Sequence, residues 1–157
     1  MNARRMLLIG MAGVVLLLAG CSMGSLMIQE RRSPYDFDRT VALVQENARA
    51  QGWLVPKVHN FQQSLVKHGQ PDPGRLTVIK LCKPEFATRM FGSDDTKYVS
   101  VMAPCSISIY EKTDGNTYVA SMRMGLIGHL MGAEVGRVMA DVDADDRQIL
   151  RFLEQTD

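Results

Sequence analysis

Polar and apolar positions alternate along the chain with two different periods, which predicts strands and helices in turn. Strand-like runs lie at residues 26–33, 53–58, 76–81, 104–112 and 117–124. Helical runs lie at residues 37–51, 61–67, 83–91, 126–140 and 145–155. Because strands and helices are interspersed, we expect one α+β domain. Its sheet is predicted to be mainly antiparallel, with the helices packed on one face.

Local signals support several of these boundaries. Asp36 is suited to cap the first helix, and Pro84 fits the first turn of a later one. Pro56 interrupts the second strand, which is therefore expected at an edge of the sheet. The pair Asp114-Gly115 predicts a hairpin in the C-terminal half of the chain.

The register of that hairpin follows if Asp114-Gly115 is a two-residue turn. One face then carries the pairs Cys105–Met124, Ile107–Met122 and Ile109–Ala120, and the other carries Ser106, Ser108, Ser121 and Arg123. One extra residue at the glycine would exchange the two faces.

In this register the buried face ends in the sulfur atoms of Cys105, Met122 and Met124, which would suit a soft metal such as Cu(I). Methionine is also ordinary core packing. His129 by itself is typical of a surface histidine. It would become a fourth metal ligand, or an axial haem ligand, only if it faced Met124. Copper and haem are therefore the two candidate cofactors, and the alternative is a protein without a cofactor.

The N-terminus has the pattern of a secretory signal peptide. In residues 1–20, Arg4 and Arg5 precede an apolar run that is too short to span a bilayer. The segment ends in Leu18-Ala19-Gly20-Cys21, which resembles a bacterial lipobox. This resemblance implies cleavage before Cys21 and attachment of lipid to its thiol, which would anchor the protein to a membrane.

Cleavage there divides the chain into a lipidated tether, residues 21–27, and one globular domain, residues 28–157. Ser22 directly after the lipidated cysteine favours the outer membrane, facing the periplasm, with the inner membrane as the alternative. Residues 1–20 hold two of the 18 basic residues and none of the 17 acidic ones, which leaves 16 against 17. Because the sequence also has no cluster of Lys and Arg, it gives no electrostatic footprint for nucleic-acid binding.

Cys82 is predicted at the end of a strand, just before a helix. The amides of that helix N-terminus and the ammonium group of Lys83 favour a thiolate, and hence a reactive thiol or a ligand. The alternatives are apolar packing or half of a disulfide. Residues 76–82 and 104–111 are expected to be neighbouring strands, so Cys82 should lie near Cys105. In an oxidising compartment two such thiols favour a disulfide or a redox pair.

Gly128, Gly132 and Gly136 recur every four residues in the predicted helix 126–140. Such a stripe permits close approach of another backbone, and we expect it to pack on the sheet or on a second subunit in a homodimer. The Asp-rich run at residues 141–146 lacks the glycine and late glutamate of a calcium-binding loop. It is interpreted as the N-terminal cap of the last helix.

Familiar catalytic motifs are missing from the sequence: it has no CxxC pair, nucleophile elbow, phosphate loop or metalloprotease motif. We therefore assign no catalytic residue and do not expect an enzyme. An enzyme that uses Cys82 alone as an activated thiol is the remaining alternative.

Several short motifs resemble one family. "GWLVP", "LCKPEFATRM", "APCSISIYE" and "VASMRMGLIGHLMG", in this order over residues 28–153, are similar to the family called domain of unknown function 302. The resemblance implies a small α+β domain that is often exported, and paired thiols at Cys82 and Cys105. Ser106 stands where the family often has arginine, so an anion-binding role is not carried over.

Two hypotheses of function follow from the residues and the resemblance. One is a lipid-anchored accessory protein with a redox or ligand-binding site at Cys82 and Cys105. The other is a structural lipoprotein that forms a homodimer and contains a structural disulfide.

Overall fold

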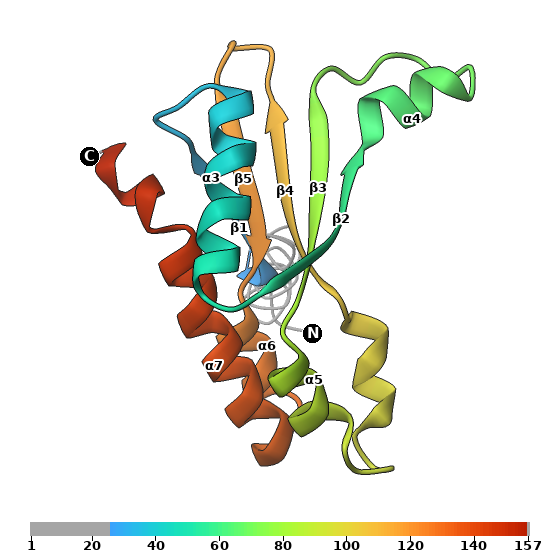
Figure 1. The fold of residues 1–157 in the computed structure, drawn as a ribbon, viewed down its shortest axis with the longest axis vertical. Helices are drawn as coiled ribbons and strands as arrows, with labels where there is room; N and C mark the ends of the chain where they lie inside the picture. The colour runs from blue at the N-terminus through green and yellow to red at the C-terminus, as the bar shows by residue number, and fades with distance from the viewer. Residues whose placement is uncertain (1–25, 157) are drawn as a thin grey trace, which may run out of the picture.

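The structure is a computed structural model that describes residues 26–156. The predicted signal peptide and Cys21 lie outside the described residues. Five strands form one antiparallel sheet in the order β1-β5-β4-β3-β2 (Figure 1). The strands are β1 (Ile28–Arg32), β2 (Leu54–Asn60), β3 (Leu76–Cys82), β4 (Cys105–Glu111) and β5 (Thr117–Met122). The helices are α3 (Phe37–Ala50), α4 (Phe61–Lys67), α5 (Pro84–Phe91), α6 (Met124–His129) and α7 (Ala133–Ile149), with 3-10 helices η1 (Lys97–Met102) and η2 (Arg151–Thr156).

The predicted α+β class and antiparallel sheet are confirmed. Asp36 caps α3, because its Oδ1 accepts a hydrogen bond from the Arg39 backbone N–H at 2.8 Å. Pro84 is the first residue of α5. The edge position of β2 is also confirmed, and its pairing with β3 shifts register between Leu54 and Lys57, on either side of the proline.

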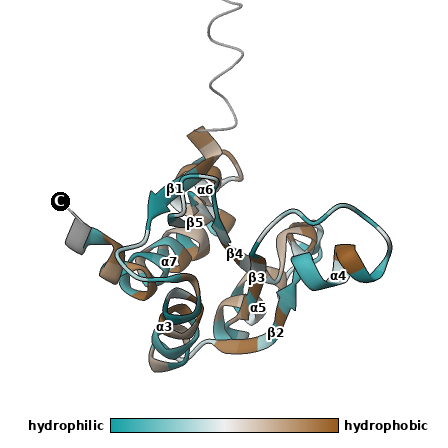
Figure 2. Ribbon diagram, turned by 90° about the horizontal axis from the view of Figure 1, so that it is seen from above, coloured by the Kyte–Doolittle hydropathy of each residue, from teal (hydrophilic) through white to brown (hydrophobic). Residues whose placement is uncertain are grey.

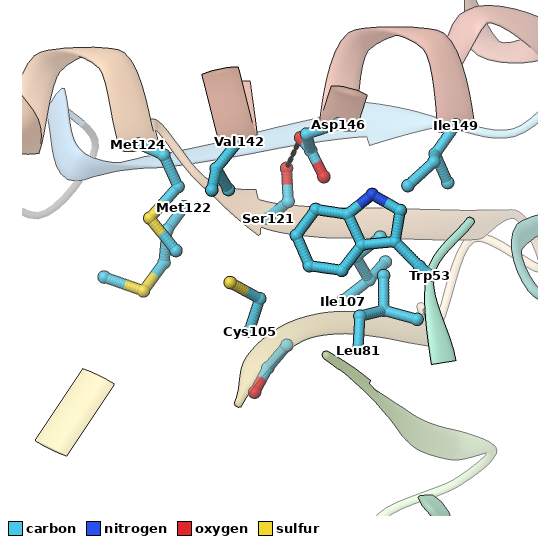
Figure 3. Close-up of a pocket in the computed structure, with 11 residues that line it drawn as sticks. Trp53, Leu81, Cys105, Ile107, Ser121, Met122, Met124, Val142, Asp146 and Ile149 are labelled. Atoms are coloured by element: carbon cyan, nitrogen blue, oxygen red, sulfur yellow. Dashed lines mark hydrogen bonds between the residues drawn. The ribbon is translucent and has the colours of Figure 1, made fainter. Parts of the chain in front are cut away.

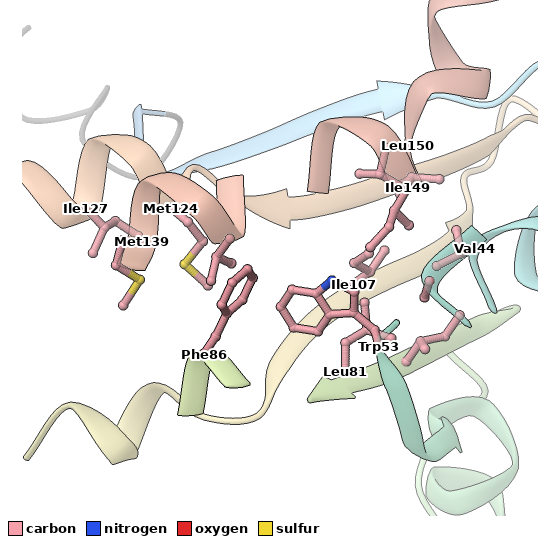
Figure 4. Packing of buried hydrophobic residues seen from close by; sticks show 14 of the residues in the cluster. Val44, Trp53, Leu81, Phe86, Ile107, Met124, Ile127, Met139, Ile149 and Leu150 are labelled. Atoms are coloured by element: carbon pink, nitrogen blue, oxygen red, sulfur yellow. The ribbon is translucent and has the colours of Figure 1, made fainter. Parts of the chain in front are cut away.

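Helices α3 and α7 cover one face of the sheet (Figure 2). Alternate residues of β3, β4 and β5 point into this layer and are buried, among them Ile79, Ile107 and Val119. Trp53, Leu81 and Ile107 meet Ile149 and Leu150 from the end of α7 (Figure 4). The core therefore lies between the sheet and these two helices, and it extends to α5, η1 and α6 through Phe86, Val99 and Ile127.

The intervening residues of the same strands form the second face of the sheet. Val78, Ser108 and Ala120 on this face are only half-buried. At the edge, the Glu30 carboxylate accepts hydrogen bonds from Tyr110 and Lys112. This face is therefore nearer to solvent than the core face, and polar contacts lie along its edge.

The helical prediction for the C-terminal part was wrong. The expected helices 126–140 and 145–155 are replaced by α6, a break at Gly132, and one continuous α7. Gly132 has φ of +83° and precedes α7, so the backbone turns there instead of continuing the helix. Within residues 26–156, no helix has both the length and the apolar character that crossing a membrane requires.

Candidate functional site

The candidate site lies at the end of the sheet where β3 finishes and β4 begins. Leu81 pairs directly with Cys105 across these strands. The prediction that residues 76–82 and 104–111 are neighbouring strands is therefore confirmed, and Cys82 is one residue out of register with Cys105. Directly after Cys82, Lys83 takes the N-cap position of α5.

Both cysteines are free and half-buried in the structure. They line one crevice of about 40 Å³, whose wall is predominantly apolar. Its remaining wall comes from the residue before β2, from β3, from α5 with its N-cap, from α7 and from the segment before β4, with Trp53, Leu81, Lys83, Phe86, Ala87, Met90, Phe91, Ala103, Pro104 and Val142. A direct bond between the two thiols stays a prediction, because facing strand residues share a face and these two are offset by one.

A second, smaller cavity lies on the other side of Cys105. Its volume is about 20 Å³, enough for roughly one water molecule. Figure 3 shows the Cys105 sulfur pointing toward the side where Met122 and Met124 lie. Trp53 and Leu81 border both hollows, so Cys105 stands between them.

Cys105, Met122 and Met124 line this small cavity together, but the predicted hairpin register is not the reason. Ile107 pairs with Ser121, not with Met122, so the predicted hairpin register was wrong by one residue. The turn has three residues: the Lys112 backbone N–H bonds to the Asn116 carbonyl, and Gly115 has φ of +76°.

The shifted register moves side chains between the two faces. Ser121, predicted on the outer face, is 5% exposed and belongs to the core face. Met124 reaches the cavity because β5 ends at Met122 and the chain enters α6 two residues later.

Two carboxylates from α7 complete the site. The Asp146 carboxylate accepts hydrogen bonds from Ser121 Oγ at 2.9 Å and from Gln29 Nε2 at 3.3 Å. Asp145 accepts from Trp53 Nε1 at 2.9 Å and from Lys83 Nζ at 2.7 Å. The Lys83 ammonium group is therefore engaged by Asp145.

These contacts correct the prediction for the Asp-rich run. Asp145 and Asp146 lie in the last turns of α7, so they do not cap a helix N-terminus. Sequence reasoning missed them because their partners on β1, β5 and the start of α5 are remote in the chain.

Burial is the main cause of the pKa shifts of the two titratable groups beside the small cavity. It raises the pKa of the Cys105 thiol to about 11, and the charge of Asp146 and then Cys82 act in the same direction. Burial also raises the pKa of Asp146 to about 6, while the hydrogen bond from Ser121 opposes this shift. Cys105 is thus held as a neutral thiol at neutral pH.

His129 does not join the sulfur atoms. It is exposed at the end of α6, whereas Met124 at the start of that helix is buried. The condition for a fourth metal ligand or an axial haem ligand is therefore not met. Among residues 26–156, no three His, Cys, Asp or Glu side chains form a group suited to a metal ion.

The glycines act within the chain. A Cβ on Gly128 would lie 2.7 Å from the Met139 Cβ, and one on Gly136 would lie 2.9 Å from the Gly128 carbonyl oxygen. The expected close approach is confirmed for these two, but it joins α6 to α7. A Cβ on Gly132 would meet nothing within 4 Å. The surface predicted for a homodimer is thus already occupied at two of its three glycines.

Fold and site together define a small α+β protein with two thiols and a sulfur-lined cavity at one end of its sheet. The chain belongs to the family described as Domain of unknown function DUF302, which matches residues 29–155. This confirms the family that the sequence motifs suggested.

One solved structure supports the same fold. The chain is similar to an uncharacterized conserved protein DUF302 from Bacillus stearothermophilus, with a TM-score of 0.70 and 15% identity over 84% of this chain and 99% of that one. At this identity the similarity shows the fold alone. No curated protein matched the chain.

Proposed function

We propose that the protein is a lipid-anchored accessory protein of the periplasm whose Cys82 and Cys105 form a thiol redox site. The observation that carries this proposal is that both residues line one crevice at the ends of adjacent strands. The lipobox-like sequence Leu18-Ala19-Gly20-Cys21 supports the anchor, and Ser22 supports the outer membrane.

The proposed reaction is exchange with a disulfide of a partner protein or of a small molecule such as oxidised glutathione. The Cys82 thiolate attacks one sulfur of that disulfide and releases the first partner thiolate. Cys105 then attacks Cys82 in the mixed disulfide and releases the second. Two electrons pass to the partner, and the two protons from the cysteines end on its thiolates.

The order of the two cysteines follows from their surroundings. The raised pKa of Cys105 leaves little thiolate at neutral pH, so it is unsuited to the first attack. Cys82 lies at the open crevice, one residue before the N-cap of α5. Cys105 is therefore assigned the resolving role.

Trapping the mixed disulfide tests this assignment. Cys105→Ser treated with oxidised glutathione should retain one glutathione on Cys82, and the matched variant Cys82→Ser should form little adduct. The parent chain should instead lose both thiols without gaining mass from glutathione. Intact-mass spectrometry after alkylation under denaturing, non-reducing conditions measures all three.

Two results would contradict the redox proposal. Two free thiols in the parent after this treatment would exclude a redox pair formed by Cys82 and Cys105. A bond that stays oxidised in reducing glutathione buffers would instead identify the structural disulfide of the alternative hypothesis.

A soft-metal site is the second candidate, favoured by the cavity that Cys105, Met122 and Met124 line together. Thiolate and thioether sulfur are ligands that Cu(I) prefers, and binding would release the Cys105 proton. Competition with a Cu(I) chelator should show binding that Met124→Leu abolishes. The control Met90→Leu changes a methionine of the neighbouring crevice and should bind like the parent.

A further inference from the structure

The end of the domain where β1 begins carries an apolar surface. Leu26, Met27 and Ile28 are exposed there, and so are Leu126 and Leu130 at α6. We call these five residues the β1–α6 patch. Single exposed apolar residues are ordinary, but a group of five at one place calls for a partner.

Backbone contacts hold the two parts of this patch side by side. The Arg123 backbone N–H, at the N-cap of α6, donates to the Met27 carbonyl at 2.8 Å. In the next pair along, Ile28 faces Met122 across the β1–β5 ladder. Figure 2 shows apolar colouring beside α6, where β1 begins.

Helix α6 presents two leucines to this surface. Leu126 and Leu130 are four residues apart and so lie on one side of the helix. Met124 and Ile127, on the adjoining side of the helix, are buried. Leu130 is 72% exposed, more than any other leucine among the described residues. Packing in the core therefore does not explain why this side of α6 is apolar.

Chain length places the patch near a membrane if Cys21 carries lipid. Four residues lie between Cys21 and Leu26, and the five residue-to-residue steps from one to the other span roughly 17 Å in a fully extended chain. Leu26 belongs to the patch itself, so this end of the domain is the one that a short tether brings to the bilayer surface.

We infer that the β1–α6 patch lies on the lipid bilayer, as a second contact beside the lipidated cysteine. Apolar side chains at a membrane interface gain by burial between headgroups and acyl chains, and a second contact strengthens a lipid anchor. This inference rests on the lipid anchor of the proposed function. It adds a fixed orientation, in which the end of the sheet that bears Cys82 and Cys105 faces the membrane.

A tryptophan probe tests the orientation in the full, lipidated chain. Leu130→Trp places a reporter in the patch, and Val66→Trp places one on α4, an exposed site at the opposite end of the domain (Figure 1). Both are bound to vesicles of phosphatidylethanolamine and phosphatidylglycerol that contain phosphatidylcholine brominated on its acyl chains. The emission of the parent chain corrects for Trp53.

The tryptophan at position 130 is expected to shift to the blue and to lose intensity to the brominated lipid, whereas that at position 66 should do neither. Full intensity at position 130 in chains that float with the vesicles would overturn the orientation and leave the anchor standing. A blue shift without quenching would likewise overturn it, because a protein partner would then cover the patch. Chains that fail to float would overturn the anchor and the orientation together.

Discussion

The two faces of the sheet use neighbouring residues of the same strands for different purposes. On β4, Ile107 points under the helices and is 1% exposed, whereas Ser108 beside it lies half-buried on the other face. The covered face gains stability from apolar area removed from water. The other face has exposed ion pairs, which contribute little. We therefore expect mutational cost to alternate along one strand.

The largest expected effect is on the covered face. Ile107→Ala should lower the free energy of unfolding by about 2–5 kcal/mol, because it removes a fully buried side chain and leaves a cavity. Its neighbour provides the control, since Ser108→Ala should change stability by less than about 0.5 kcal/mol. Urea denaturation measures both, and equal costs would show that the two faces of the sheet do not differ in their contribution to stability.

The helical layer above that face should be sensitive to one methyl group. Gly128→Ala should cost about 1–3 kcal/mol, since its Cβ would lie 2.7 Å from the Met139 Cβ and force α6 away from α7. Gly132→Ala is the comparison variant. Gly132 has a positive φ and open space around it, so any loss of stability there comes from backbone strain and not from packing. Thermal unfolding of the two variants checks this, and a neutral Gly128→Ala would show that α6 can shift freely.

Asp146 should make the covered face respond to pH. Its pKa of about 6 in the folded protein exceeds that of a carboxyl group in the unfolded chain, so the group reduces stability at pH 7 and the reduction fades as the pH falls through 6. Asp146→Asn should therefore raise stability by about 1–2 kcal/mol at pH 7 and by less at pH 5.

Melting temperatures at the two pH values measure this difference. Asp141→Asn, an exposed aspartate on the same helix, is the control. A loss of stability in Asp146→Asn at both pH values would mean that the hydrogen bonds from Ser121 and Gln29 outweigh the burial of charge.

The smallest effect is expected on the second face. Hydrogen bonds from Lys112 and then Tyr110 lower the pKa of Glu30, so its stabilisation is present at neutral pH and is lost as the pH falls below the usual range of a glutamate. Because the pair is exposed, Glu30→Gln should cost less than about 1 kcal/mol. A double-mutant cycle with Lys112→Met isolates the pair, and a larger coupling would show that this face carries real stability.

Sequence patterns predicted the features that local chemistry determines. The cap at Asp36, the helix start at Pro84 and the edge position of the strand with Pro56 each depend on one residue and its immediate neighbours. The adjacency of β3 and β4, and with it the approach of Cys82 to Cys105, followed from the order of the elements.

The patterns failed where distant contacts decide. A turn of three residues instead of two moved Ser121 to the core face, and the sequence Asp114-Gly115 allows both. The break at Gly132 could not be separated from a glycine stripe by spacing alone. The roles of Asp145 and Asp146 depend on hydrogen bonds from Trp53 and Ser121, which only the folded chain brings near.

The proline in β2 has a consequence for association between molecules. Exposed sheet edges can recruit a strand from another chain and so begin aggregation. Pro56 lacks a backbone donor, and the register shift around it interrupts the ladder of this edge strand. The opposite edge, β1, is only five residues long and carries Glu30, Arg31 and Arg32. Both edges therefore disfavour strand addition, and copies of this protein that associate would do so through faces or helices.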